Sequence, residues 1–123
     1  MKIERKQEIY EELLPEIRSA LSACPDIVAG MATVACILHH AFPQFFWTGF
    51  YRVVDPSLLA IGPYQGTLGC LTIPFDRGVC GFSATAKETI IVDDVHEFEG
   101  HIACDSRSCS EIVVPFFDSK GEV

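Results

Sequence analysis

The chain changes character near residue 42, and this switch limits what it can fold into. Before it, apolar residues recur at helical spacing in residues 2–22, and residues 27–41 are nearly all apolar or small, so both segments are predicted helices. After it, short segments rich in aromatic and β-branched residues alternate with turns, which favours strands. The predicted strands span residues 45–54, 58–64, 68–75, 89–92 and 111–117. Two helices followed by mainly antiparallel strands predict an α+β domain with the helices layered on a sheet.

Proline, glycine and acidic residues mark where these elements end. Pro15 is expected to kink or divide the first helix, since it cannot donate a backbone hydrogen bond. Asp26 is expected to cap the second helix, and that helix is expected to be buried against the sheet. Residues 55–57 predict a hairpin turn, and residues 76–81 predict a glycine-flanked turn that opens a short helix through about residue 87.

The last predicted strand is followed by a turn at residues 118–121, and the chain ends two residues later. A hairpin turn without a returning strand leaves one edge of the preceding strand unpaired. We therefore expect the sequence to be cut short. At 123 residues it is expected to form a single domain.

Composition narrows the class of protein. The hydrophobic fraction is 49%, which argues for a packed domain. No apolar run approaches the roughly 20 residues that a membrane helix needs. Residues 1–12 mix basic and acidic side chains and lack the apolar stretch of a secretory signal, so the expected compartment is the cytoplasm. The net charge of −8 disfavours nucleic acids and anionic membranes as partners.

Six cysteines carry most of the chemical information: Cys24, Cys36, Cys70, Cys80, Cys104 and Cys109. Without a secretory signal, a framework of structural disulfides is disfavoured, which leaves core, metal-binding and redox roles. Cys36, in the second helix, is interpreted as a small core residue, and so is Cys24, at a helix boundary with partial exposure. From the residues alone, Cys70 has the same interpretation, because it lies within a strand pattern.

Two cysteines lie in settings that favour reactivity. Cys80 stands at the junction of a turn and a helix, where free backbone N–H groups favour a thiolate. Cys104 lies in a long polar loop, residues 93–107, where His101 and Arg107 are local groups that would support its thiolate. The alternative is a zinc site, with four candidate ligands in and beside that loop: His96, His101, Cys104 and Cys109. Their spacing matches no familiar zinc motif and the chain has no Cys-x-x-Cys pair, so no metal is predicted.

Seven short strings occur in the order found in one enzyme family. They are residues 47–51, 62–66, 70–74, 77–81, 94–96, 100–105 and 110–115. The most specific are Gly78-Val79-Cys80-Gly81 and Gly100-His101-Ile102-Ala103-Cys104-Asp105. With them the chain resembles the free methionine-R-sulfoxide reductases, which are stand-alone GAF-domain enzymes. The resemblance implies a GAF-like, PAS-related fold with an antiparallel sheet and the N-terminal helices packed on one face.

The resemblance implies a role for three of the cysteines. Cys104 matches the catalytic cysteine, whose thiolate attacks the sulfur of free L-methionine-(R)-S-oxide and becomes a sulfenic acid. Cys70 matches the resolving cysteine that forms a disulfide with it, and Cys80 matches a third, auxiliary thiol. The resemblance implies no bound cofactor, since thioredoxin, supplied with electrons from NADPH, resets the disulfide.

Three further residues match the family's substrate pocket. Trp47 and Tyr51 match residues around the methyl-sulfinyl end of the substrate, although the residues alone would place both in the core. Glu111 matches an acidic substrate-binding residue. It begins an apolar strand, where a carboxylate needs a partner such as the ammonium group of a bound amino acid.

The resemblance also implies further elements at the C-terminal side. The family's next strand, with its acidic Leu-Asp-Ile-Asp-like string, and its final helix would lie beyond Val123. Residues 1–123 are therefore expected to form one GAF domain that lacks the last strand or strands and the C-terminal helix, and a homodimer is the expected assembly. The alternative function is a non-catalytic GAF module that binds a ligand or senses redox state. The missing strand favours that alternative, and the three matched cysteines disfavour it.

Overall fold

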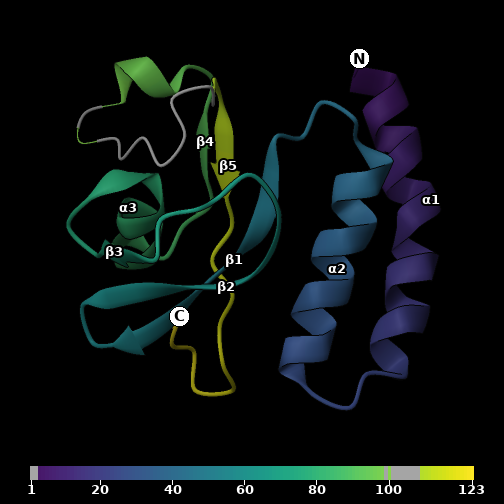
Figure 1. Cartoon of the computed structure of the whole chain (residues 1–123), viewed down its shortest axis with the longest axis horizontal. Helices are drawn as coiled ribbons and strands as arrows, with labels where there is room; N and C mark the ends of the chain where they lie inside the picture. The colour runs from purple at the N-terminus through teal and green to yellow at the C-terminus, as the bar shows by residue number, and fades with distance from the viewer. Residues whose placement is uncertain (1–2, 99, 101–108) are drawn as a thin grey trace. The chain divides into compact units, whose positions relative to one another are not determined.

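The computed structural model describes residues 3–98, 100 and 109–123, and Figure 1 shows the arrangement of its elements. The chain divides into two compact units. The first comprises Met1–Phe50 and Gly62–Thr67, and the second comprises Tyr51–Ile61 and Leu68–Val123. The division runs through the hairpin of strands β1 and β2, so each unit contains part of both strands.

The two predicted N-terminal helices, α1 (Ile3–Ser22) and α2 (Ile27–Ala41), are present and pack side by side in the first unit (Figure 1). Asp26 caps α2 as predicted, because its carboxylate accepts a hydrogen bond from the Ala29 N–H at 2.8 Å. Of the two outcomes expected at Pro15, a kink or a division, the division is wrong, since α1 is a single helix through that residue. Pro15 is exposed, so the carbonyl that its missing N–H leaves without a helical bond can be hydrated.

α2 is less buried than its composition predicts. Its buried residues are Gly30 and Ala35, whereas Ile27 in the first turn is 72% exposed. Cys36, predicted to fill the core, is exposed as well. Small residues lie on the inner side of α2 because α1 approaches closely: a Cβ on Gly30 would lie 3.3 Å from a methyl group of Leu21.

Three strands form a sheet in the order β1-β2-β3. Their bounds are Trp47–Asp55, Leu58–Gly66 and Thr72–Pro74. The predicted hairpin turn at residues 55–57 is confirmed. β2 pairs antiparallel with β3, and this register sets Leu59 opposite Ile73, both of them buried.

β3 is shorter than predicted, because residues 68–71 do not join the sheet as a strand. Leu68 and Leu71 are 79% and 74% exposed, so neither face of this segment is buried as strand alternation would require. Cys70 therefore lies in irregular backbone just before β3, and its predicted place within a strand is wrong.

Within the described residues a second sheet pairs β4 (Ile90–Val92) with β5 (Glu111–Val113), antiparallel, whereas the sequence predicted a single sheet. β5 ends four residues before the predicted strand does, and Phe116 beyond it is 65% exposed. The turn predicted after it is confirmed, since the Asp118 carbonyl accepts a hydrogen bond from the Gly121 N–H at 3.0 Å.

Helix α3 (Gly78–Ala86) packs against β3 and also against β4 and β5 of the second sheet. Two clusters of buried side chains fill the spaces around it. One consists of Leu59, Ile73 and Ala84, and the other of Val79, Val92 and Val95. Val95 opens η1 (Val95–Glu97), a short 3₁₀ helix at the start of the predicted loop. None of the helices in the described ranges is both long and apolar enough to cross a membrane.

Candidate active site

Three of the predicted site residues meet on one buried cluster of the second unit. Tyr51 from β1, Cys70 from the segment before β3 and Cys80 from α3 all pack against Leu59, Ile73 and Ala84. The side chains of both cysteines contact this cluster. The fold therefore brings two cysteines that lie ten positions apart in the sequence to the same apolar surface.

A hydrogen bond joins Tyr51 to Cys70. The phenol hydroxyl donates to the backbone carbonyl of Cys70 at 2.7 Å, in a part-buried setting. Both ends are fixed by packing on the shared cluster, Tyr51 through its ring and Cys70 through its side chain. Tyr51 is thus more than a core residue, because its polar end holds the backbone of a predicted redox cysteine.

The oxidation states of the cysteines differ. Cys70 is disulfide-bonded. Four cysteines carry free thiols: Cys24, Cys36, Cys80 and Cys109. The predicted catalytic residue Cys104 and its predicted helpers His101 and Arg107 lie outside the described residues.

Cys80 is the third residue of α3, at the junction that the sequence predicted. Gly81 beside it allows the helix to approach β3, since a Cβ there would lie 2.5 Å from the Pro74 carbonyl oxygen. The expected thiolate is wrong, however. Burial, and after it the negative charge of Glu111, raises the pKa of the Cys80 thiol to about 12. These two effects outweigh the helix N-terminus, so Cys80 is a neutral thiol near pH 7.

Glu111 is the first residue of β5, where it pairs with Val92 of β4 and is half-buried. β5 packs against α3, and the negative charge of Glu111 acts on the Cys80 thiol of that helix. Tyr51, Cys70 and Cys80 therefore form one group on this apolar cluster, and Glu111 is linked to that group through the charge that it exerts on Cys80.

Trp47 belongs to the first unit, at the start of β1. Its indole stacks on the Tyr64 ring of β2, with centroids 5.3 Å apart and planes at 23°. Gly49 makes room for this pair, because a Cβ there would lie 2.7 Å from the indole and 2.3 Å from Tyr64 Cβ. The string of residues 47–51 thus has a packing reason of its own: glycine is required where the two aromatic side chains meet.

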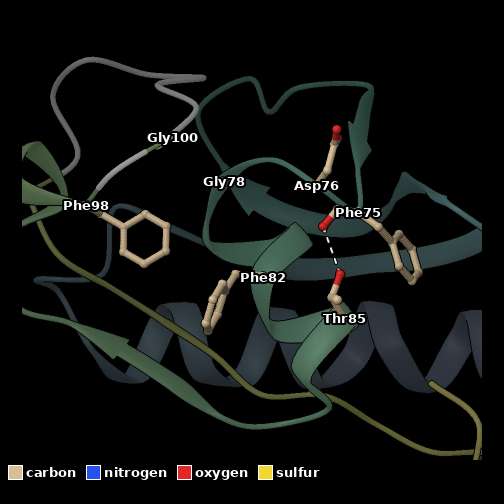
Figure 2. Close-up of a pocket in the computed structure, with 7 residues that line it drawn as sticks. All are labelled: Phe75, Asp76, Gly78, Phe82, Thr85, Phe98 and Gly100. Atoms are coloured by element: carbon tan, nitrogen blue, oxygen red, sulfur yellow. Dashed lines mark hydrogen bonds between the residues drawn. The ribbon is translucent and has the colours of Figure 1, made fainter.

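A separate hollow of about 320 Å³ lies on the second unit (Figure 2). Its lining residues are Phe75, Asp76, Gly78, Phe82, Thr85, Phe98 and Gly100. The rings of Phe82 and Phe98 lie edge to face, 6.1 Å apart, and the Thr85 hydroxyl donates to the Phe75 carbonyl at 2.9 Å. None of the five predicted site residues within the described ranges lines it. No pattern in the sequence marks this hollow, because the half-exposed position of Phe82 depends on tertiary packing.

Metal binding finds no support in the part of the chain that the structure describes, where no three His, Cys, Asp or Glu side chains gather as ligands. Of the four candidate zinc ligands, His96 and Cys109 belong to that part, and the Cys109 carbonyl accepts a hydrogen bond from the Val95 N–H at 2.9 Å. His101 and Cys104 lie outside it.

Known proteins resemble this chain over most of its length, although no family model matches it. It is 45% identical over 112 residues to GAF domain-containing protein A of Dictyostelium discoideum, which aligns 91% of this chain with 70% of that protein. It is 37% identical over 123 residues to the free methionine-R-sulfoxide reductase of Saccharomyces cerevisiae, with 95% of this chain and 68% of that protein covered.

Comparison with solved structures also finds a free methionine-R-sulfoxide reductase. The free methionine-R-sulfoxide reductase from Neisseria meningitidis, in complex with its substrate, matches with a TM-score of 0.90 at 46% identity, covering 95% of this chain and 70% of that one. The fold is thus that of a GAF domain, as predicted. More narrowly, the chain belongs to the free methionine-R-sulfoxide reductase family, which makes it an oxidoreductase.

Proposed function

We propose that this protein reduces free L-methionine-(R)-S-oxide to L-methionine by thiol chemistry, with Cys104 as the nucleophile. The observation that carries the proposal is the packing of Tyr51, Cys70 and Cys80 on one apolar cluster, with Glu111 acting on Cys80 through its charge, in a member of this reductase family. A ligand-binding module without catalysis would not need a second redox cysteine at that place.

The first step makes the product. The Cys104 thiolate attacks the sulfoxide sulfur, the sulfoxide oxygen takes up a proton, and the oxygen passes to Cys104 as the sulfur–oxygen bond of the substrate breaks. The products are methionine and a Cys104 sulfenic acid, so the enzyme sulfur is oxidised by two electrons and the substrate sulfur is reduced by two.

The second step resolves the sulfenic acid. The Cys70 thiol displaces the hydroxyl group from Cys104, so a disulfide forms and water leaves. The disulfide-bonded state of Cys70 supports this choice, as do the free thiols of the four other described cysteines. Cys80 suits the auxiliary role better, because a thiol with a pKa near 12 supplies very little thiolate at pH 7.

Substrate recognition is proposed to use three side chains. The Trp47 and Tyr51 rings would hold the methyl-sulfinyl end, and the Glu111 carboxylate would pair with the substrate ammonium group. Such an ion pair explains why selection would favour a half-buried carboxylate at the start of β5. It also explains a preference for the free amino acid, because a residue within a peptide has no ammonium group.

The proposed setting is the one that the family resemblance implies. Thioredoxin, reduced at the expense of NADPH, would return the disulfide to two thiols, in the cytoplasm and in a homodimer. No bound cofactor is needed for these steps, since each electron pair moves between sulfur atoms.

A coupled assay tests the proposal. Purified protein is supplied with thioredoxin, thioredoxin reductase, NADPH and either the R or the S form of free methionine sulfoxide, and NADPH oxidation is followed. We expect turnover with the R form, none with Cys104→Ser, and wild-type rates with Cys36→Ser, which removes an exposed thiol of α2. Tight binding of the sulfoxide without turnover would instead support the sensing module.

A further inference from the structure

Hydrogen bonds from β1 and β2 hold the backbone of the segment that carries Cys70. Residues 67–71 lie between β2 and β3 and belong to neither strand. The side chains of Leu68 and Leu71 are largely exposed, so they do not fix the segment by burial. One anchor is the Ile61 N–H, which donates to the Leu71 carbonyl at 3.0 Å. Another is the Tyr51 hydroxyl on the Cys70 carbonyl at 2.7 Å.

The hydrogen bond from Tyr51 is made to the proposed resolving cysteine itself. It holds the carbonyl of Cys70 itself, and it comes from β1, a nine-residue strand within the sheet. The Tyr51 ring and the Cys70 side chain also pack on the same cluster of Leu59, Ile73 and Ala84. A hydrogen bond between a regular strand and an irregular segment limits how far the cysteine can move from its place on that cluster.

We propose that the Tyr51 hydroxyl is a positioning group for the resolving step, which holds Cys70 where its thiol can reach the sulfenic acid. This inference rests on the proposed function and extends it, since the resemblance gives Tyr51 only a wall of the substrate pocket. The ring and the hydroxyl then have separate tasks. The ring packs, and the hydroxyl orders the backbone of Cys70.

Because the hydroxyl bonds to the backbone of Cys70, it acts on the second chemical step, in which Cys70 takes part. Disulfide closure needs the Cys70 sulfur in line with the sulfur–oxygen bond of the sulfenic acid, so disorder of Cys70 lowers the rate of closure. Attack on the sulfoxide involves the other cysteine and is independent of where Cys70 lies. Loss of the Tyr51 hydroxyl should therefore slow disulfide closure more than it slows the attack on the sulfoxide.

Tyr51→Phe removes the hydroxyl and keeps the ring. Fully reduced protein is mixed with excess sulfoxide in the absence of any reductant and quenched at set times. Methionine is measured to monitor the first step, dimedone traps the sulfenic acid, and peptide mapping after thiol alkylation monitors disulfide closure. Tyr10→Phe is the matched control, because Tyr10 lies on α1, where its ring packs tilted against Phe42.

We expect Tyr51→Phe to slow disulfide closure roughly three- to tenfold relative to the methionine burst, and the dimedone adduct to increase, in line with the loss of one hydrogen bond. An unchanged closure rate overturns the inference. A burst that slows together with closure, or a higher KM with normal closure, also overturns it, because the hydroxyl would then act on the substrate. Absence of a burst in wild type refutes the proposed function itself, so the two failures are distinct.

Discussion

Cys80 and Glu111 are electrostatically coupled across the second unit, from the first turn of α3 to the first residue of β5. Burial makes the larger contribution and the Glu111 charge the smaller one, and together they raise the pKa of the Cys80 thiol to about 12. At pH 7 Cys80 is therefore a neutral thiol. A cysteine that the sequence marked as reactive is thus held in its unreactive form.

Removal of the Glu111 charge should make Cys80 more reactive. In wild type the rate of Cys80 alkylation should rise about tenfold for each pH unit between 7 and 10, as expected below the pKa. In Glu111→Gln the rate should be higher at every pH in that range, because the charge that opposes the thiolate is gone. Mass spectrometry of the Cys80 peptide after timed iodoacetamide exposure measures this.

Glu88→Gln is the control, since it also removes one carboxylate but from an exposed position after α3. It should leave the rate of Cys80 alkylation unchanged. Equal rates in wild type and Glu111→Gln would mean that burial alone suppresses the thiolate.

The same coupling predicts how stability depends on pH. The pKa of Cys80 is higher in the folded protein than in the unfolded chain, where a thiol has a pKa of about 8.5. The folded state therefore holds the proton more tightly, so this contribution to the free energy of unfolding is complete below about pH 8 and is lost as the pH rises towards 12. Cys80→Ala should lack this loss.

Urea unfolding of the reduced wild type and of reduced Cys80→Ala at pH 7, 8, 9 and 10 measures the effect. At pH 7 the variant should be the less stable protein, since it loses packing on the Leu59, Ile73 and Ala84 cluster. The stability difference should shrink above pH 9. A difference that stays constant from pH 7 to pH 10 would contradict the raised pKa.

Local sequence signals predicted most of the fold because they act over a few residues. The Asp26 cap, the hairpin at residues 55–57 and the turn after β5 each depend on an aspartate side chain that accepts a hydrogen bond from the backbone two or three residues on. The short lengths of β3 and β5 were not predicted, because strand propensity does not say where a partner strand ends. Local sequence also did not predict that α1 continues through Pro15 or that Ile27 of α2 is exposed. Both outcomes depend on the tertiary surroundings of the helix.

The sequence was sufficient to identify candidate site residues, whereas their contacts and electrostatic interactions could be seen only in the structure. Strings such as Gly78-Val79-Cys80-Gly81 identify cysteines and the glycine that permits close packing. The Tyr51–Cys70 hydrogen bond and the effect of Glu111 on Cys80 join residues 19 and 31 positions apart, and no local pattern encodes them. The prediction of a Cys80 thiolate was wrong because it weighed the helix end alone, without burial and a distant carboxylate.

The two candidate resolving thiols should respond differently to substitution. In Cys70→Ser the sulfenic acid has no partner, so one methionine per site should form in the absence of reductant and dimedone should trap most of the protein. In Cys80→Ser the disulfide should close at close to the wild-type rate, because its neutral thiol takes little part. Peptide mapping should find Cys70 joined to Cys104 in oxidised wild type. A cross-link from Cys104 to Cys80 or Cys109 would contradict this assignment.

The proposed contact between Glu111 and the substrate ammonium group predicts a selective loss of affinity. Glu111→Gln keeps the shape of the side chain and removes its charge, so the KM for free methionine-R-sulfoxide should rise roughly ten- to a hundredfold, as expected for the loss of one hydrogen bond to a charged group. N-acetylmethionine-R-sulfoxide has no ammonium group, so in wild type its KM should be higher than that of the free amino acid. The substitution Glu111→Gln should leave this KM nearly unchanged. The ratio of the two kcat/KM values in each protein measures the contribution of this contact. If Glu111→Gln raises the KM for both substrates by the same factor, the carboxylate acts on the site as a whole and not on the ammonium group.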